Sequence, residues 1–358
     1  MAQARVWDLF CRVIDNFGDI GVCWRLASDL AVRGATVRLR TDAAAALRWM
    51  APQGQAGVEV LPWSLSESQG SLTDPGDVVI EAFGCNLPDA FIRRMAARPR
   101  APVWINLEYL TAQPFALQCH GLSSPQSVGA GAGLTKWFFH PGFVPGTGGL
   151  IRERDLESRQ RDFDALAWRA SKGVEVQCGE RCVSLFCYAA AALPALLHAL
   201  ADAPTLVLAT PGAASERIQQ LLGPMLRRGA LRAIALPWLS QPDFDHLLWS
   251  CDINFVRGED SWVRAQWADR PFVWQAYVQS DAAQHAKLDA FLDLYLHGAT
   301  PALAHAVRAI WASWNGQSNA AIVFPDAAWQ DHHHHWRDAL RVQPDLTTQL
   351  LDFVDQRR

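Results

Sequence analysis

Short apolar runs that favour β-strands alternate along this chain with longer segments whose apolar residues recur at helical spacing. In the first part of the chain, strands are predicted at residues 6–11, 36–40, 58–61 and 77–82, and helices at residues 20–32 and 42–50. Gly34 stands where the C-terminal cap of the first helix belongs. Strands and helices that alternate through short loops are typical of a doubly wound parallel sheet, in which ligands bind at the carboxyl ends of the strands.

A second series of the same kind begins near Arg181. It predicts strands at residues 182–187, 205–209, 231–235 and 252–255, and helices at residues 190–200, 213–221 and 242–249. A glycine- and proline-rich stretch, residues 141–149, and a charged stretch, residues 152–164, separate the two series. We therefore predict an α/β protein with two Rossmann-like domains that face each other across a central cleft. The first is expected at residues 1–175 and the second at residues 176–342, with a helix at about 343–358 that packs back on the first.

Composition narrows the possible partners. The chain has 358 residues, 50% of them apolar, which is enough for two cores. Its 32 basic and 36 acidic residues nearly balance, so no strong field attracts nucleic acid or an anionic membrane. The most apolar window, residues 188–208, is interrupted by prolines and polar residues and cannot span a membrane. Because the first residues also lack a secretory leader, the sequence predicts a cytoplasmic protein with no membrane or nucleic-acid partner.

Cysteines and histidines do not form a metal-binding pattern. Eight cysteines without a secretory leader favour reduced thiols, and the spacing of Cys178, Cys182 and Cys187 does not match a zinc site. Four consecutive histidines, residues 332–335, point in four directions on a helix and cannot converge on one ion. No metal site is predicted from either group.

Two aspartates occupy the loop after the first predicted strand. Asp15 and Asp19 flank Gly18 directly before the first helix. Either carboxylate alone could cap the helix, but a pair allows one to cap while the other acts as a base or holds a cation. The loop lacks the G-x-G-x-x-G pattern of a dinucleotide fold, and its negative charge repels a pyrophosphate. The first domain is therefore predicted to bind a neutral or cationic group, and the nucleotide is expected on the second.

A strand end in the second series carries a different combination of groups. Residues 255–267 follow a strand and begin a helix, with Arg257 and Ser261 on either side of Gly258. A helix start with a glycine, a hydroxyl and a guanidinium can bind an anion through backbone amides, dipole and charge together. The alternative is that Asp260 or Ser261 only caps the helix and that Arg257 lies on the surface. The first interpretation predicts a diphosphate site that needs no metal.

Aromatic residues lie at neighbouring strand ends. Trp238, Gln241 and Phe244 belong to one loop, and Phe186 and Tyr188 follow the first strand of the second series. Aromatic faces and an amide can stack on and hydrogen-bond a nucleobase, although the same aromatics are equally suited to a core.

The D-x-D pattern of metal-dependent transferases occurs twice, at residues 162–164 and 243–245. Both copies stand at predicted helix starts. Capping is therefore the favoured interpretation of both.

Several segments resemble one family. Residues 11–26 and 255–267 resemble the amino- and carboxyl-domain motifs of the EarP family, the protein-arginine rhamnosyltransferases that modify translation elongation factor P. Shorter matches at residues 104–110, 120–122, 139–143 and 147–150 extend the resemblance over most of the chain. The resemblance implies an inverting, metal-independent GT-B glycosyltransferase. Such an enzyme moves L-rhamnose from dTDP-β-L-rhamnose to an arginine side chain of elongation factor P.

The resemblance also implies roles for individual residues. Asp19 would be the base or guanidinium-orienting carboxylate, Asp15 its essential neighbour and Glu259 a third functional carboxylate. The diphosphate would bind to Arg257, Asp260 and Ser261, and the thymidine to Phe186, Tyr188, Trp238, Gln241 and Phe244. No cofactor or metal is implied beyond the donor.

The acidic loop suits a guanidinium acceptor on chemical grounds. A guanidinium has a pKa above about 12 and is a poor nucleophile, so carboxylates must localise its electrons on one nitrogen and accept a proton during attack. Two alternatives remain at this point. One is a GT-B transferase with another sugar or acceptor, and the other is a non-catalytic two-domain protein that binds a cationic ligand through Asp15 and Asp19.

Overall fold

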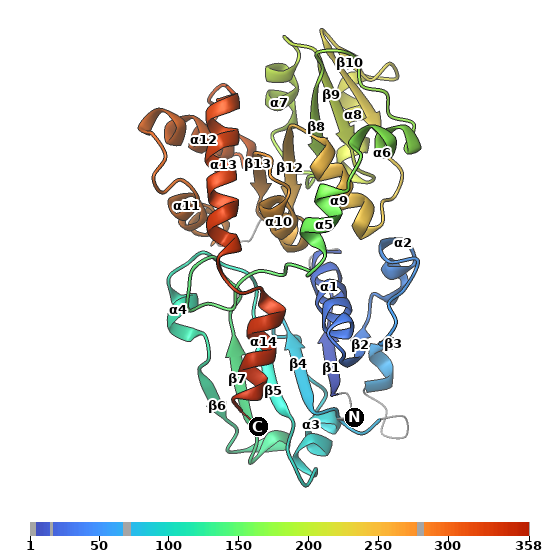
Figure 1. The fold of residues 1–358 in the computed structure, drawn as a ribbon, viewed down its shortest axis with the longest axis vertical. Coiled ribbons are helices and arrows are strands. Elements are labelled where there is room, and N and C mark those ends of the chain that lie inside the picture. The colour runs from blue at the N-terminus through green and yellow to red at the C-terminus, as the bar shows by residue number, and fades with distance from the viewer. Residues whose placement is uncertain (1–4, 15–16, 67–72, 278–282, 358) are drawn as a thin grey trace. The chain divides into compact units, whose positions relative to one another are not determined.

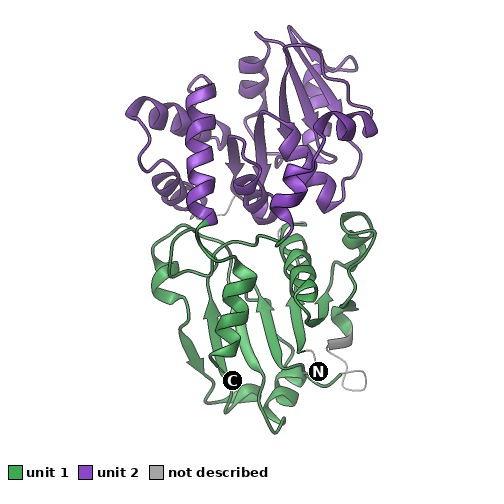
Figure 2. Cartoon of the chain, viewed as in Figure 1, with its two compact units in different colours: residues 1–154, 342–358 green, residues 155–341 purple. Residues whose placement is uncertain are grey.

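The structure, a computed structural model, describes residues 5–14, 17–66, 73–277 and 283–357. These residues form two compact α/β units (Figure 2). The first unit comprises residues 1–154 and 342–358, and the second comprises residues 155–341. The chain therefore leaves the first unit once and returns to it with its last helix.

The first unit is built on one sheet with the strand order β3-β2-β1-β4-β5-β7-β6 (Figure 1). The pair β6 and β7 is antiparallel, and the other neighbouring pairs are parallel. The strands of this unit are β1 (Val6–Cys11), β2 (Thr36–Thr41), β3 (Val58–Pro62), β4 (Val78–Ala82), β5 (Val103–Leu107), β6 (Ser123–Pro125) and β7 (Thr135–Phe139). Its helices are α1 (Gly18–Val32), α2 (Leu47–Met50), α3 (Asp89–Ala96), α4 (Phe115–Cys119) and α14 (Leu346–Asp355).

The central strand β1 sets the position of the acidic loop. It is buried along nearly its whole length because its residues are mostly apolar, as a strand covered on both faces requires. The strand order reverses beside it, since β2 lies on one side of β1 and β4 on the other. Ligands of doubly wound folds bind at such a reversal, outside the carboxyl ends of the strands. The loop after Cys11 lies at this point of the first unit.

The C-terminal helix α14 packs on the first unit beside α1 (Figure 1). Leu350 and Val354 of α14 are fully buried in the same core as α1. At the end of α1, Arg33 donates to Asp345 over 2.7 Å and to Thr348 over 2.6 Å. Asp345 also caps α14 by accepting from the Thr348 amide at 2.9 Å. Apolar burial and the ion pair between Arg33 and Asp345 thus help to hold the last helix in place.

The second unit contains a sheet with the order β10-β11-β9-β8-β12-β13, in which β10 and β11 are antiparallel and the other neighbouring pairs are parallel. Its strands are β8 (Arg181–Leu185), β9 (Thr205–Ala209), β10 (Arg227–Arg228), β11 (Leu231–Ala235), β12 (Ile253–Arg257) and β13 (Phe272–Gln275). Its helices are α5 (Leu156–Arg161), α6 (Ala165–Ser171), α7 (Leu193–Leu200), α8 (Ala213–Leu222), α9 (Gln241–Ser250), α10 (Gly258–Trp267), α11 (Ala283–Tyr295), α12 (Pro301–Trp314) and α13 (Asp326–Arg341).

The strand order of the second unit reverses between β8 and β12. The segment after β8 and the turn from β12 into α10 therefore lie side by side, and the Phe186 amide donates to the Phe255 carbonyl over 2.9 Å. The predicted strand at 182–187 ends at Leu185, so Phe186 and Tyr188 stand beyond the sheet, at its carboxyl edge.

The boundary between the units lies at 154/155, earlier than the predicted 175. Helices α5 and α6 belong to the second unit, because α6 is attached to α9. Trp168 donates to Asp243 over 2.9 Å, and Lys172 forms an ion pair with the same carboxylate at 2.9 Å. Trp168 also packs in the apolar core of that unit. From residue 342 onward the chain falls in the first unit.

The predicted helix at 42–50 is interrupted. Residues 44–46 form a short 3₁₀ turn, and α2 begins only at Leu47. The side chains before this segment bind other backbone groups instead of continuing a helix. The Thr41 hydroxyl accepts from the Ala43 amide at 3.1 Å, and Asp42 accepts from the Val13 amide at 3.0 Å. Asp42 thereby ties this segment to the loop that carries the predicted acidic pair.

Candidate active site

The acidic loop of the first unit is closed by Asp19. This residue lies in the first turn of α1 and is only 1% exposed. Its Oδ2 atom accepts from the Ile14 amide at 2.7 Å, which binds the end of the loop to the start of the helix. The N-cap residue is Phe17, with no side-chain cap, so Asp19 does not act as the helix cap. Negative charge in the first turn is favourable beside the positive end of the helix dipole. Asp15 lies outside the described residues.

Neighbouring strand ends add further groups at this edge of the first unit. After β4, Phe83 has a φ of 57° and Gly84 a φ of 63°, an uncommon conformation for phenylalanine. The Phe83 ring stacks on Tyr109, which follows β5, with 4.3 Å between ring centroids. Burial raises the pKa of the adjacent Glu108, which accepts a hydrogen bond from Asn106. An aromatic pair and a half-buried carboxyl thus lie one and two strands away from the end of β1.

In the second unit, Arg257 lies between two aromatic rings at the strand reversal. Its guanidinium carbon is 4.2 Å from the ring centroid of Phe186 and 4.4 Å from that of Tyr188. A guanidinium on an aromatic face is attracted by the ring quadrupole. Arg257 ends β12, whereas both rings follow β8, so the sheet order brings the three together. The structure therefore groups three of the predicted donor-site residues.

The turn from β12 into α10 has the geometry of an anion site. Gly258 has a φ of +64°, a left-handed conformation that favours glycine. The Ser261 hydroxyl accepts from the Arg257 amide at 3.1 Å and donates to the Arg257 carbonyl, so it fixes this turn. No side chain of the N-cap residue covers the first amides of α10, which have no acceptor within the helix. Glu259 and Asp260 stand in the same first turn.

Helix α9 supplies the third side of the candidate donor site. Gln241, in its first turn, donates to Asp260 over 3.2 Å and so joins the start of α9 to the start of α10. The Phe244 ring lies edge-on to Phe186, with 5.5 Å between centroids. Trp238, in the loop before α9, is 54% exposed. The structure thus connects Gln241 and Phe244 to the group around Arg257.

Two residues of this site were missed by the sequence analysis. Gln275, at the end of β13, is buried and accepts from the Tyr188 amide at 2.8 Å. Tyr277 lies edge-on to Tyr188 at 5.5 Å between ring centroids and is 48% exposed. Gln275 ends β13 and Tyr277 follows it. Because β13 is the neighbour of β12, only knowledge of the sheet order would have pointed to these two residues.

Cys187 lies between the two aromatic residues that contact Arg257, yet it is not a reactive thiol. Burial raises its pKa to about 12. A nucleophilic cysteine requires a lowered pKa, so this residue is a buried apolar group of the site.

The D-x-D patterns have partners other than a metal. Asp164 caps α6 by accepting from the Leu166 and Ala167 amides at 2.9 and 3.0 Å. Asp243 binds Trp168 and Lys172, whereas Asp245 is paired with Arg264. The capping interpretation is confirmed for residues 162–164. It is wrong for residues 243–245, because Ser240 caps α9 by accepting from the Asp243 amide at 3.2 Å. Among residues 5–14, 17–66, 73–277 and 283–357, no three His, Cys, Asp or Glu side chains converge as a metal site requires.

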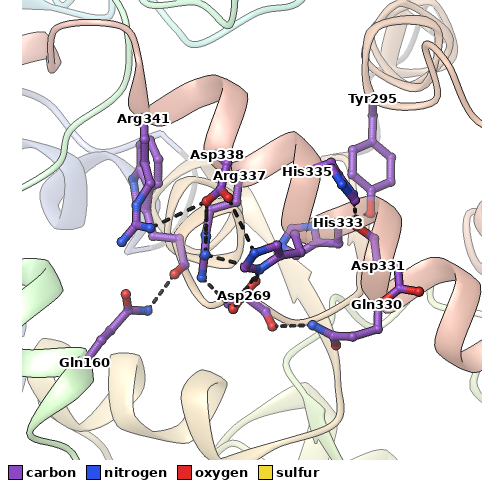
Figure 3. Close-up of polar contacts among 12 residues, drawn as sticks. Gln160, Asp269, Tyr295, Gln330, Asp331, His333, His335, Arg337, Asp338 and Arg341 are labelled. Carbon is purple, nitrogen blue, oxygen red and sulfur yellow. Dashed lines mark hydrogen bonds and ion pairs between the residues drawn. The ribbon is translucent and has the colours of Figure 1, made fainter.

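The histidine run on α13 diverges as predicted, and Figure 3 shows His333 and His335 among their neighbours. His333 is buried against the Tyr295 hydroxyl at 3.3 Å, whereas His332 contacts the Tyr295 carbonyl. His334 lies against Asp269, and His335 turns back to the Asp331 carbonyl of its own helix. The four rings serve packing and local hydrogen bonds.

A cavity of about 330 Å³ lies at the opposite edge of the second sheet. Arg181, Ile253 and Pro271 line it, at the amino ends of β8, β12 and β13. The candidate donor residues follow the other ends of these strands, so the cavity is separate from them.

Over the described part of the chain, no helix combines the length and apolar character needed to cross a bilayer.

Comparison with known proteins places this chain in a family. Residues 7–355 match the family model described as elongation factor P (EF-P) rhamnosyltransferase EarP. A protein-arginine rhamnosyltransferase of Pseudomonas aeruginosa is 41% identical over 375 residues, which cover 97% of this chain and 98% of the relative. That of Pseudomonas putida is 43% identical with the same coverage.

Solved structures show the same relationship. One, described as the structural basis for EarP-mediated arginine glycosylation of translation elongation factor EF-P, has a TM-score of 0.66 and 31% identity, covering 98% of this chain and 99% of the other. A Streptomyces glycosyltransferase in complex with thymidine diphosphate has a TM-score of 0.52 at 12% identity, covering 98% and 99%, and shows the fold alone. The predicted GT-B fold and the predicted family are both confirmed.

Proposed function

This chain belongs to the EarP family of elongation factor P rhamnosyltransferases, and we propose that it transfers L-rhamnose from dTDP-β-L-rhamnose to an arginine side chain of elongation factor P. The reaction inverts the configuration at the sugar carbon and takes place in the cytoplasm. The observation that carries this proposal is the pair of specialised strand ends, an acidic one in the first unit and one built on Arg257 in the second.

The donor binds to the second unit. Its diphosphate lies at the start of α10, where the Arg257 guanidinium and the first helix amides offset its charge. The thymine stacks on the aromatic group made by Phe186, Tyr188 and Phe244. Asp260 and Ser261 hold the turn, and Trp238 supplies an exposed ring at the mouth of the site.

The acceptor arginine binds to the first unit. Asp15 and Asp19 hold its guanidinium and localise its electrons, and one Nη atom attacks the anomeric carbon of rhamnose. The bond between that carbon and the diphosphate oxygen breaks, and dTDP leaves with the electron pair. The proton of the attacking nitrogen passes to Asp19. Glu259, in the first turn of α10, is the third functional carboxylate and lies beside the bound donor.

The reaction needs no metal in this proposal. Arg257 and the helix amides carry the charge that develops on the leaving diphosphate, which is the role that a divalent cation has in metal-dependent transferases. Transfer is therefore expected to continue in EDTA, whereas loss of activity on chelation, restored by a divalent cation, would contradict this part.

Mass spectrometry tests the whole proposal. The purified chain is incubated with dTDP-β-L-rhamnose and elongation factor P, and one deoxyhexose is expected on a single arginine of the acceptor. Controls omit the donor or replace the modified arginine by lysine. Absence of a mass shift, under conditions in which dTDP binds the chain, would refute the proposed activity. A panel of other dTDP-sugars then separates rhamnose transfer from transfer of another sugar, and the anomeric configuration of the product, read by NMR, tests inversion.

A further inference from the structure

A buried ion pair joins the two helices that form the donor site. Arg264 of α10 donates through Nε and Nη2 to the two oxygens of Asp245 of α9, each over 2.8 Å. Both side chains are only 1% exposed. Two parallel hydrogen bonds fix the relative orientation as well as the distance of the groups that they join. The pair therefore sets how α9 and α10 lie against each other within the second unit.

The ion pair lies about one helical turn after the donor residues Gln241 and Asp260, toward the C-terminal end of each helix. Asp245 stands four residues after Gln241 on α9, and Arg264 stands four residues after Asp260 on α10. Residues four apart lie on the same face of a helix. The contact between Gln241 and Asp260, at 3.2 Å, and the ion pair are thus two successive links between the same two helix faces.

Other contacts hold α9 to its own surroundings, since Leu247 and Cys251 pack in the apolar core with β8 and β9. On its other side, α9 is held to α6 by Asp243, which binds Trp168 and Lys172. Arg159 of α5 also approaches Asp245, at 3.6 Å. If the ion pair weakens, α9 stays attached to α6 and to this core while α10 remains attached to β12, and the starts of the two helices lose one of the two links that align them.

We propose that Asp245 and Arg264 are positioning residues for the nucleotide donor, acting by holding Gln241 and Phe244 of α9 in register with Arg257 and Asp260 at the start of α10. This proposal rests on the proposed function in one respect, since it takes these residues as the donor site. Neither member of the pair touches the donor. Their effect is on donor affinity and not on the proton transfer at Asp19.

The test compares the same substitution at two ion pairs. Arg264→Lys keeps the charge but loses the planar fork. Arg232→Lys is the matched control, because Arg232 binds Glu180 through two hydrogen bonds of 2.6 and 2.7 Å at the amino edge of the same sheet. The dissociation constant for dTDP, measured by calorimetry without acceptor, is the primary readout. The melting temperature and the donor and acceptor KM values complete the set.

Arg264→Lys is expected to raise the dTDP dissociation constant and the donor KM about tenfold, with the acceptor KM and kcat within about twofold. Arg232→Lys is expected to lower the melting temperature while leaving dTDP binding within about twofold. A double variant with Gln241→Ala should weaken dTDP binding by less than the product of the single effects, because the links act on the same alignment.

Three results would overturn the proposal. They are unchanged dTDP binding in Arg264→Lys, equal loss of binding in both lysine variants, or fully multiplicative effects in the double variant. If Arg264→Lys does not melt cooperatively, Asp245→Asn is measured in its place, and failure of both assigns the pair to the fold as a whole and overturns the proposal. If the wild-type chain binds dTDP but transfers no rhamnose, the proposed function fails while this comparison still stands.

Discussion

Replacing Asp19 by asparagine separates its role in the fold from its role in transfer. Asparagine keeps an acceptor oxygen for the Ile14 amide, which Asp19 binds at 2.7 Å. The change from a charged to a neutral acceptor costs about 1 kcal/mol, and loss of negative charge in the first turn of α1 costs about 0.3–1 kcal/mol more. Because domains are stable by about 5–15 kcal/mol, Asp19→Asn stays folded.

Transfer is expected to respond far more strongly than stability. An amide cannot accept the proton of the attacking guanidinium, and a positioned general base contributes about 10²–10⁴ in rate. This corresponds to about 2.7–5.4 kcal/mol of activation free energy. We therefore expect kcat to fall at least about a hundredfold, with the dTDP dissociation constant unchanged, because the donor binds to the other unit.

The assay is rhamnose transfer followed by intact-mass spectrometry, together with calorimetric binding of dTDP. Asp29→Asn is the control, since Asp29 is also a buried aspartate of α1 and pairs with Arg33 at 2.8 Å. Arg33 keeps its ion pair with Asp345 in this variant, so stability should fall by only about 1–3 kcal/mol, and kcat should be retained. A kcat for Asp19→Asn within about tenfold of wild type would refute Asp19 as the base.

Three further predictions follow from single contacts. Arg257→Lys keeps the charge but loses the guanidinium face between Phe186 and Tyr188, so calorimetry should show dTDP binding weakened by about tenfold; unchanged binding would contradict the anion site. Asp345→Ala removes both the cap of α14 and the ion pair to Arg33. Urea unfolding should show that the free energy of unfolding falls by about 2–4 kcal/mol. A decrease below about 0.5 kcal/mol would mean that apolar contacts alone hold the helix. Burial lowers the pKa of His333 to about 3, below its unfolded value of about 6.5, so its contribution to stability is complete above pH ~6.5 and is lost as the pH falls toward 3. Between pH 7 and 4.5 this loss is on the order of 2–3 kcal/mol. His333→Gln should remove it from the pH dependence of unfolding, and His335→Gln, at an exposed position, should not.

The sequence was sufficient where local pattern and tertiary structure agree. The first strand was predicted with its observed bounds, Val6–Cys11, because an apolar run is bounded by turn-forming residues. Helix α1 was predicted from one apolar face, and the start of α10 from a glycine after a strand. The acidic loop and Arg257 are predicted as site residues for the same reason, since strand ends of a doubly wound sheet are where ligands bind, and the structure places Asp19 and Arg257 at such ends.

Features that depend on contacts between residues far apart in the chain could not be predicted from the sequence. Asp243, which is remote in the chain, attaches α6 to the second unit. Because the sequence does not show this contact, the domain boundary is predicted at 175 and not at 154/155. The contribution of Tyr277 depends on β13 lying beside β12. The ion pair between Asp245 and Arg264 could not be predicted either, because nothing in the residues next to Asp245 indicates that Arg264 is its partner.

The two units use one topology for opposite charges, and the proposed function assigns one substrate to each. In each unit the functional loop follows the central strand or its neighbour at the reversal of strand order. The first unit places Asp19 there, in the first turn of α1, where the helix dipole would otherwise favour an anion. The carboxylate occupies that favourable position itself and leaves a negative site that repels diphosphate and attracts a guanidinium. The second unit has Arg257 at the equivalent edge, and its rings hold the guanidinium beside the start of α10. In the proposed function, a donor with two phosphates is therefore selected by the second unit and rejected by the first, so that each substrate has only one favourable position.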